Sequence, residues 1–312
     1  MNRFEKNLPL ISKILAFIFT IFFFNCNVFF NLDTQKNGKN REILGALLLS
    51  SSANATSSSQ GTSQTTPQSQ TSFRFGIVGD SWTNFGSAGV SDLRVQLANR
   101  GYQMTGTTTA GITLSTALSQ NLHRRAIDSA GNTIKYIIVS LGGNDYQNNL
   151  TAYINASVNG GTAVTARIAT IQSNLNTMIN DGNSYKISRY GGGNLIWILH
   201  GYDYPNVTVP LCTIATPITS SYTTWGTSLG ASVADVNYVA TTGFNALNTM
   251  YQNVASASGG SVRYINLRGT LGGPPNSNSA SMFDCIHPNT NGFNLIANAF
   301  VSVMTTFTGT DR

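Results

Sequence analysis

Ser81 stands at a place in this chain where a side chain could attack a carbonyl carbon. It follows the apolar run 75–78, which is typical of a short buried strand, after the turn residues Gly79 and Asp80. A polar group directly after a buried strand is presented at the carboxyl end of the sheet, where open α/β sheets bind ligands. Gly-Asp-Ser is also ordinary turn chemistry, so the tripeptide alone leaves both interpretations open.

The chain also carries an acid and a base that could serve such a serine. Asp284 lies three residues before His287 in one predicted loop, close enough for its carboxylate to reach the Nδ1 side of the imidazole ring. A nucleophilic serine needs a base to take its proton, and the base needs a carboxylate that fixes its tautomer and stabilises its cation. With Ser81, these two residues form a complete set for acyl transfer.

Acyl transfer further requires hydrogen-bond donors for the oxyanion of the tetrahedral intermediate. Three groups near the ends of predicted strands could supply them: the N–H of Ser81, the N–H of Gly111 and the side-chain amide of Asn144. The N–H of Leu114 is an alternative to that of Gly111, because a backbone donor tolerates either residue type.

Four short blocks of the sequence resemble those of the SGNH hydrolases, also called GDSL esterases and lipases. Each block is weak alone, but all four occur in the family's order and cover the chain from about 73 to 305. The second block departs most from the pattern, because Thr and Ala precede the glycine where many relatives carry an Asn. The blocks are Gly79-Asp80-Ser81, Gly111, Gly142-Gly143-Asn144-Asp145 and Asp284-x-x-His287-Pro288.

The resemblance implies a fold and a role for each matching residue. The fold is a three-layer α/β/α sandwich with a flavodoxin-like parallel sheet. Ser81 would be the nucleophile, His287 the general base and acid, and Asp284 the group that orients it, with Gly111 and Asn144 in the oxyanion hole. The sequence lacks Gly-x-Ser-x-Gly at Ser81, which argues against the larger α/β-hydrolase fold.

The elements that must position these residues can be read from hydrophobic periodicity. Unbroken apolar runs predict buried strands, and apolar residues at helical spacing predict helices between them. Strands separated by helices favour a parallel sheet with helices on both faces, in a single domain over 73–312. The predicted strands are 75–78, 136–141, 194–199 and 262–267; the predicted helices are 90–99, 164–179 (ending before Gly182), 233–254 (long or broken) and about 291–307.

Other polar residues have competing interpretations. Asp80 and Asp145 are predicted to satisfy turn backbone groups rather than to catalyse. His200 and Tyr202 follow a predicted strand at the same sheet edge as the site, so each is a substrate contact or a packed loop residue. His123 is predicted to be solvated on a polar helix. No group of His, Cys and acidic residues has metal-ligand spacing, so neither a metal nor another cofactor is expected.

The three cysteines suggest one disulfide. If Cys26 is lipidated, Cys212 and Cys285 remain as an even pair, which would be oxidised in an exported protein. The bridge would tie the loop that holds Asp284 and His287 to the loop after the strand 194–199. Two buried free thiols are the alternative, because cysteine often serves as a small core residue.

The N-terminus is predicted to be a signal peptide over 1–25, with basic residues before the apolar run 14–24. Cys26 follows in a segment that resembles a relaxed bacterial lipobox, although Asn25 stands where a small residue is usual. The alternatives are an uncleaved anchor reaching Phe30 and ordinary secretion with cleavage at the A-x-A site 53–55. Residues 26–72 are predicted to form a flexible polar linker, uncharged from 50 to 72.

Composition limits the partners. Charged residues make up only 10% of the chain, so neutral polar residues must cover the surface, which suits an exported protein. The net charge of +6 is scattered without a basic run, so nucleic-acid binding has little support.

The sequence therefore predicts an exported, membrane-tethered serine esterase that works through an acyl-enzyme. Short-chain acyl esters or O-acetyl carbohydrate esters are the favoured substrates, with lipid or lysophospholipid esters as the alternative. The competing hypothesis is a surface lipoprotein that uses the same scaffold for binding, with little catalysis.

Overall fold

The computed structural model describes residues 73–153, 161–207, 209, 212, 220–274, 276 and 278–311. Residues 69–312 form one compact unit. The predicted signal peptide, Cys26 and the linker lie outside the described residues. Within the part of the chain that is described, no helix has both the length and the apolar character needed to cross a membrane.

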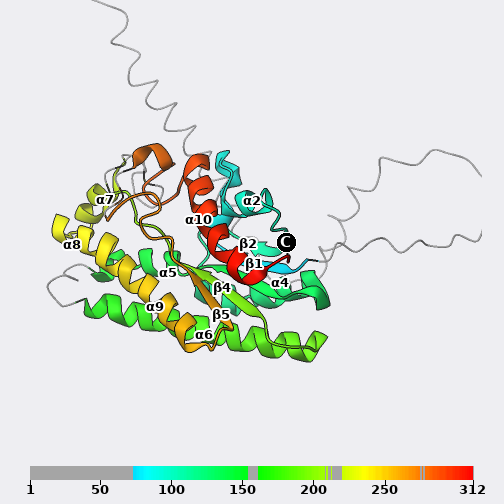
Figure 1. The fold of residues 1–312 in the computed structure, drawn as a ribbon. Coiled ribbons are helices and arrows are strands. Elements are labelled where there is room, and N and C mark those ends of the chain that lie inside the picture. The colour runs from blue at the N-terminus through cyan, green and yellow to red at the C-terminus, as the bar shows by residue number, and fades with distance from the viewer. Residues whose placement is uncertain are drawn as a thin grey trace, which may run out of the picture. The chain divides into compact units, whose positions relative to one another are not determined.

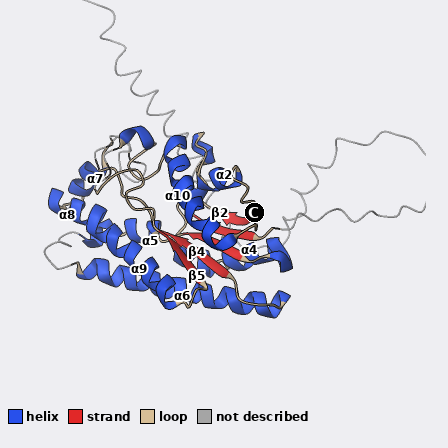
Figure 2. Cartoon of the chain, viewed as in Figure 1, coloured by secondary structure: helices blue, strands red, loops and turns tan. Residues whose placement is uncertain are grey.

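A sheet of five parallel strands occupies the centre of this unit, in the order β2-β1-β3-β4-β5 (Figure 2). Strands β1 and β3 are completely buried, and β4 is buried except at Ile196. The all-parallel sheet confirms the predicted α/β class. The strands are β1 Phe75–Gly79, β2 Met104–Thr108, β3 Tyr136–Ser140, β4 Ile196–His200 and β5 Val262–Ile265.

Helices cover both faces of the sheet (Figure 1). Trp197 and His200 of β4 point to opposite faces of the sheet. Trp197 lies beside Gly182 of α6 on one face, and the His200 ring contacts Phe300 of α10 on the other. Helices α4, α6 and α9 pack together on the Trp197 side, and α2 packs against α10 on the other. The helices are α2 Leu93–Ala98, α3 Leu114–Ser119, α4 Leu122–Ala130, α5 Gly143–Gln147, α6 Thr162–Tyr190, α7 Tyr222–Ser228, α8 Val233–Tyr238, α9 Phe244–Ala257 and α10 Thr290–Thr308. Single 3-10 turns occur at Ser81–Thr83, Gly86–Ala88, Gly131–Thr133, Leu150–Tyr153 and Ser279–Ser281.

Several elements differ from the sequence prediction, among them the short helices α3, α5 and α7, which were not predicted. Strand β2 was not predicted, because this Thr-rich edge strand is only partly buried and carries no apolar run. Helix α6 does not end before Gly182 but continues to Tyr190, because the glycine faces Trp197 and lets the helix pass close to the sheet. The predicted long or broken helix is α8 and α9, joined by one wider π-helical turn at Val239–Gly243.

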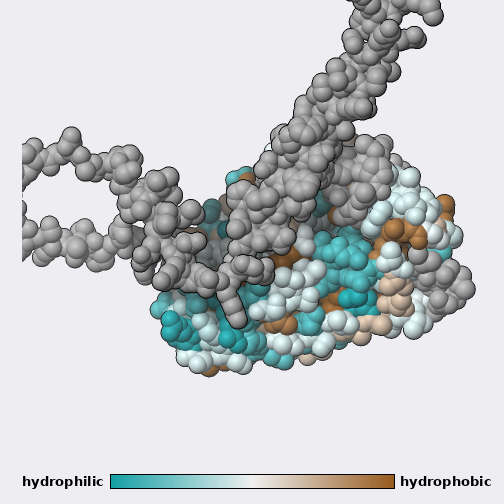
Figure 3. Space-filling model, turned by 180° about the vertical axis from the view of Figure 1, so that it is seen from behind, coloured by the Kyte–Doolittle hydropathy of each residue, from teal (hydrophilic) through white to brown (hydrophobic). Residues whose placement is uncertain are grey.

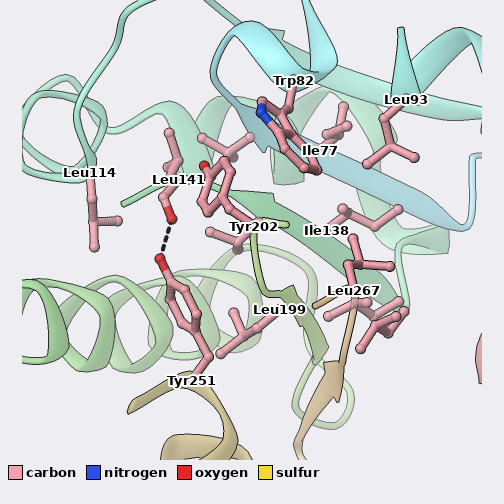
Figure 4. Packing of buried hydrophobic residues seen from close by; sticks show 14 of the residues in the cluster. Ile77, Trp82, Leu93, Leu114, Ile138, Leu141, Leu199, Tyr202, Tyr251 and Leu267 are labelled. Atoms are coloured by element: carbon pink, nitrogen blue, oxygen red, sulfur yellow. Dashed lines mark hydrogen bonds between the residues drawn. The ribbon is translucent and has the colours of Figure 1, made fainter. Parts of the chain in front are cut away.

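The core beneath the site combines aliphatic side chains with buried tyrosines (Figure 4). Ile77 of β1 and Ile138 of β3 are fully buried. The Tyr251 hydroxyl, on α9, donates a hydrogen bond of 2.5 Å to the carbonyl oxygen of Leu141, directly after β3. A helix of the outer layer is thus tied by a buried polar contact to the strand end that leads into the site.

His123 is not solvated, contrary to the prediction. Its side chain is 0% exposed, and its Nε2 lies 2.6 Å from a carboxylate oxygen of Asp181 on α6. Arg124 binds the same carboxylate, so the pair of basic residues joins α4 to α6. Burial lowers the pKa of His123 against the opposing effect of Asp181.

Hydrophilic and neutral residues dominate the described surface on the face opposite to that of Figure 1, with only small separate apolar areas (Figure 3).

Gly182 yields a test of the packing between α6 and the sheet. A Cβ atom at this position would lie 2.6 and 2.7 Å from two Trp197 ring carbons. The ring cannot move aside easily, because it is buried and its Nε1 donates to Asn183. We expect Gly182→Ala to lower the free energy of unfolding by about 1–3 kcal/mol in urea denaturation, although alanine is the better helix former.

Ser184→Ala, at an exposed position on the same helix, is the control and should leave stability unchanged or slightly raised. A Gly182→Ala protein as stable as the parent would contradict the close packing described.

Candidate active site

Ser81 begins a tight 3-10 turn directly after β1. Asp80 precedes the turn and its carboxylate accepts the N–H of Trp82 at 3.0 Å. Gly79 leaves room for the turn, because a Cβ there would lie only 2.0 Å from the Thr83 hydroxyl oxygen. The local sequence thus brings the serine back over the end of the strand.

An unbroken chain of hydrogen bonds joins Asp284, His287 and Ser81. His287 Nε2 lies 2.8 Å from Ser81 Oγ, and His287 Nδ1 lies 2.8 Å from Asp284 Oδ2. The other carboxylate oxygen of Asp284 accepts the N–H groups of Ile286 and His287, at 2.8 and 2.7 Å. All three side chains are buried, at 7% exposed for Ser81, 5% for His287 and 0% for Asp284. The structure therefore brings together the three residues singled out in the sequence.

Two aromatic residues that sequence reasoning missed support this chain. The Phe85 ring stacks on the His287 imidazole, with centroids 4.2 Å apart and planes 15° apart. Trp82 Nε1 donates to the carbonyl oxygen of Ile286 at 3.2 Å, which links the serine turn to the histidine loop. The only feature of the sequence that pointed to these two residues was their closeness to Ser81. It does not predict that either ring contacts the loop that carries His287.

The candidate oxyanion donors follow β1, β2 and β3: Ser81 begins a 3-10 turn, Gly111 lies in a loop, and Asn144 lies in the first turn of α5. Asn144 Nδ2 donates one hydrogen to the carbonyl oxygen of Ile112 at 3.0 Å, which leaves its second hydrogen for another acceptor. Among the described residues, the N–H groups of Ser81 and Gly111 have no hydrogen-bond acceptor. The N–H of Leu114 donates to Asp145 at 2.6 Å, so the alternative donor considered for the oxyanion hole is already engaged.

Asp80 and Asp145 bind backbone groups, as their turn positions suggested. Asp145 accepts the N–H groups at the start of α3, from Leu114 and Ser115. Asp80 accepts the N–H of Trp82 and the hydroxyl of Tyr202. Burial raises the pKa of Asp80 to about 6, although these hydrogen bonds oppose the shift.

Other side chains enclose His200, whereas Tyr202 reaches a small hollow. His200 is 1% exposed; its Nδ1 lies 3.1 Å from the carbonyl oxygen of Gly201, and its ring packs among those of Trp82, Tyr202 and Phe300. A substrate contact by His200 is therefore wrong, because aromatic rings enclose it. Tyr202 is 3% exposed, but its ring lines a small hollow that Trp82 also borders.

A disulfide joins Cys212 and Cys285. Cys285 lies between the two members of the acid–base pair, and its carbonyl oxygen accepts the N–H of Asn206 at 2.7 Å. The bridge spans a sequence separation of 73 residues. Closing a loop of that length contributes about 4 kcal/mol in the chain-entropy treatment. The loop that carries His287 is therefore fastened covalently to the loop after β4.

Within the described residues, no group of three or more His, Cys, Asp or Glu side chains could hold a metal ion.

The all-parallel sheet covered by helices on both faces is consistent with the α/β fold of the SGNH hydrolases. The chain belongs to the family of GDSL-like lipases and acylhydrolases, whose sequence profile matches residues 27–300. It is a hydrolase that acts on esters.

Solved structures of the same fold are similar to this chain at low sequence identity. The lipase Lip_vut3 from a goat rumen metagenome is 12% identical, with a TM-score of 0.50 over 74% of this chain and 97% of that chain. An extracellular lipase from Streptomyces rimosus is 14% identical, with a TM-score of 0.42 over 74% and 99% of the two chains. The acetyl xylan esterase AlAXEase is 16% identical, with a TM-score of 0.40 over 73% and 98%. No curated protein matches the sequence.

The burial of His200 predicts a specific pH dependence of stability. Desolvation lowers the pKa of His200 to about 4, whereas an unfolded histidine titrates near 6.5. Between these values the unfolded chain binds a proton that the folded chain does not, so stability falls as the pH drops from 6.5 to 4. His200→Phe should abolish this dependence, so the stability difference between the variant and the parent should change by about 3 kcal/mol between pH 7 and pH 4.

Urea denaturation across this pH range measures the difference. Phe300→Leu, which changes the same packing without removing a titratable group, should alter stability by an amount that does not vary with pH. If the stability difference between His200→Phe and the parent also does not vary with pH, His200 titrates normally in the folded protein.

Proposed function

We propose that Ser81 is the nucleophile of a carboxylic ester hydrolase that works through an acyl-enzyme. The observation that carries the proposal is the Ser81–His287–Asp284 chain, with 2.8 Å at each of its two links. Ser81 Oγ attacks the carbonyl carbon while His287 Nε2 takes its proton, and His287 then gives the proton to the departing alcohol oxygen. A water repeats the sequence on the acyl-enzyme, releases the acid and restores the Ser81 hydroxyl.

The oxyanion would be stabilised by donors that have no other acceptor among the described residues. The N–H groups of Ser81 and Gly111 and the second amide hydrogen of Asn144 fit this requirement, since each residue lies in a segment that follows the carboxyl end of a strand. Donors fixed in advance by the fold stabilise the developing charge without reorganisation during the reaction. Asp284, anchored by two backbone N–H groups, holds His287 in the tautomer that can accept the serine proton.

The substrate that we propose carries a short acyl group, such as an acetyl ester of a carbohydrate. Trp82 and Ile286, the chain neighbours of Ser81 and His287, border a hollow of about 10 Å³, which is room for roughly one water molecule. The other residues that line it are Gln147, Tyr202, Asp203, Pro205 and Phe244; Ser81 and His287 are not among them. This hollow next to the proposed nucleophile is too small for a long alkyl chain, which supports a small acyl group.

Removing the nucleophile or an oxyanion donor tests the mechanism. We expect Ser81→Ala to lower kcat on p-nitrophenyl acetate by on the order of 10³-fold or more, because no other group can form the acyl-enzyme. Asn144→Ala should lower kcat by on the order of 10²–10³-fold with little change in KM, because its donor acts on the transition state.

Ser119→Ala and Asn148→Ala, two exposed residues on α3 and at the end of α5, serve as matched controls and should retain the parent's rate. Parent-like hydrolysis by Ser81→Ala would overturn the assignment. A parent chain with no turnover would favour the competing hypothesis, in which the scaffold binds without catalysis.

The size of the acyl group can be tested with a series of p-nitrophenyl esters. We expect kcat/KM to be highest for the acetyl ester and lower for octanoyl and palmitoyl esters, because the hollow beside Trp82 does not hold a long chain. A rise in kcat/KM with chain length would point instead to lipid or lysophospholipid esters.

We also propose that the chain is exported and tethered to a membrane by lipid on Cys26. The apolar run 14–24 followed by Cys26 supports this, as does the uncharged segment 50–72, which would hold the folded domain away from the membrane. In cells fed a labelled fatty acid, the parent should incorporate label and Cys26→Ser should not. Equal labelling of the two proteins, or a parent without label, would contradict lipidation at Cys26.

A further inference from the structure

A second concave surface lies between α6 and α9, with a volume of about 560 Å³. These two helices pack side by side in the lower half of Figure 1. The surface reaches Asn194, two residues before β4 begins, and Ser261, directly before β5. Ser81 follows the carboxyl end of β1 in this parallel sheet. The surface therefore lies toward the amino ends of the strands, away from Ser81.

Six side-chain carboxamides line this surface, which we call the carboxamide groove. Four of them lie on α6 at spacings of four, four and three residues, which place them on one face of the helix. The six are Gln172, Asn176, Asn180 and Asn183 of α6, Asn194 before β4, and Asn253 of α9.

Only one of these carboxamides has a structural partner within the described residues. Asn183 Oδ1 accepts the N–H of Leu195 and the Nε1 hydrogen of Trp197, at 3.2 and 3.0 Å. The other five are exposed and make no side-chain hydrogen bond to a described residue. Each carboxamide offers two donors and one acceptor, so the groove presents a dense set of neutral hydrogen-bonding groups.

The chemistry of the lining restricts the ligand. None of the residues that line the groove is charged, so a phosphate or a carboxylate would find no counter-ion there. Ile179, Val254 and Val262 contribute apolar, buried side chains to the same lining. A purely apolar ligand would cover the carboxamides without hydrogen-bonding them, which costs free energy. A ligand with many hydroxyl groups and some C–H surface satisfies both kinds of side chain.

We propose that the carboxamide groove binds an uncharged glycan chain. Its volume lies within the range of ligand pockets, about 300–1,000 Å³. Binding here does not involve Ser81 and does not depend on catalysis. For an acetylated glycan it would raise the local concentration of ester groups around the domain.

Affinity electrophoresis of the full chain through native gels tests the proposal. The probes are two soluble, uncharged and unacetylated polysaccharides, hydroxyethyl cellulose and a neutral arabinoxylan. We expect at least one of them to retard the parent. Asn176→Ala/Asn180→Ala should weaken the retardation constant about tenfold, which corresponds to the loss of two ordinary hydrogen bonds.

The matched control is Asn174→Ala/Asn237→Ala, which removes two carboxamides of α6 and α8 that do not line the groove. This control should be retarded as strongly as the parent. Ser81→Ala should also be retarded as strongly as the parent, so the test of glycan binding is independent of the esterase assignment. Urea midpoints of all variants report whether they fold. No retardation of the parent by either probe, or equal retardation of both double variants, would overturn the proposal. Stronger retardation by polygalacturonate would show instead that the net charge of +6 drives the binding.

Discussion

The hydrogen bond between Ser81 Oγ and His287 Nε2 joins residues 206 positions apart, and its length of 2.8 Å depends on how two loops are held. One loop follows the central strand β1, and the other follows β5 at the edge of the sheet. Strand register alone does not fix their distance, because β3 and β4 lie between the two strands. Additional local contacts therefore hold the two loops together at the carboxyl ends of the strands.

These contacts are of several chemical kinds, and together they hold the loop that carries His287 in place. The Trp82 indole donates to the backbone of the histidine loop, and the Phe85 ring covers one face of the imidazole. The disulfide at Cys285 secures the same loop from the side of β4. Asp203 adds a further link, since its buried carboxylate accepts N–H groups of Gly269 and Leu271 in the segment after β5. The acid–base pair is thus held by aromatic packing, a covalent bond and backbone hydrogen bonds.

The buried carboxylates of Asp284 and Asp80, both at the carboxyl ends of the strands, differ in their hydrogen-bond partners. Asp284 receives two backbone N–H groups and the imidazole, as expected for a carboxylate that orients a base. Asp80, one residue before Ser81, receives a turn N–H and a tyrosine hydroxyl, and burial raises its pKa to about 6. Proximity in sequence to the serine is therefore a poor guide to which carboxylate contacts the imidazole of His287.

The sequence predicted the parts of the structure that depend on local pattern. Apolar runs identified β1, β3, β4 and β5, and motif order brought out Ser81, Asn144 and the Asp284–His287 pair. Strand β2 was missed because an edge strand needs no apolar run, and the end of α6 was misplaced because Gly182 is explained only by Trp197 across the layer. The positions of Phe85 and His200 depend on tertiary packing that one sequence does not encode locally.

The central claim is that this hydrogen-bonded chain makes Ser81, among all the serines of the protein, a nucleophile. Labelling the native protein with a fluorophosphonate and mapping the modified peptide by tandem mass spectrometry tests it most directly. The account predicts one adduct, on Ser81, formed by the parent and lost in His287→Ala. An adduct on another residue, or labelling of Ser81 that persists unchanged without the imidazole, would contradict it.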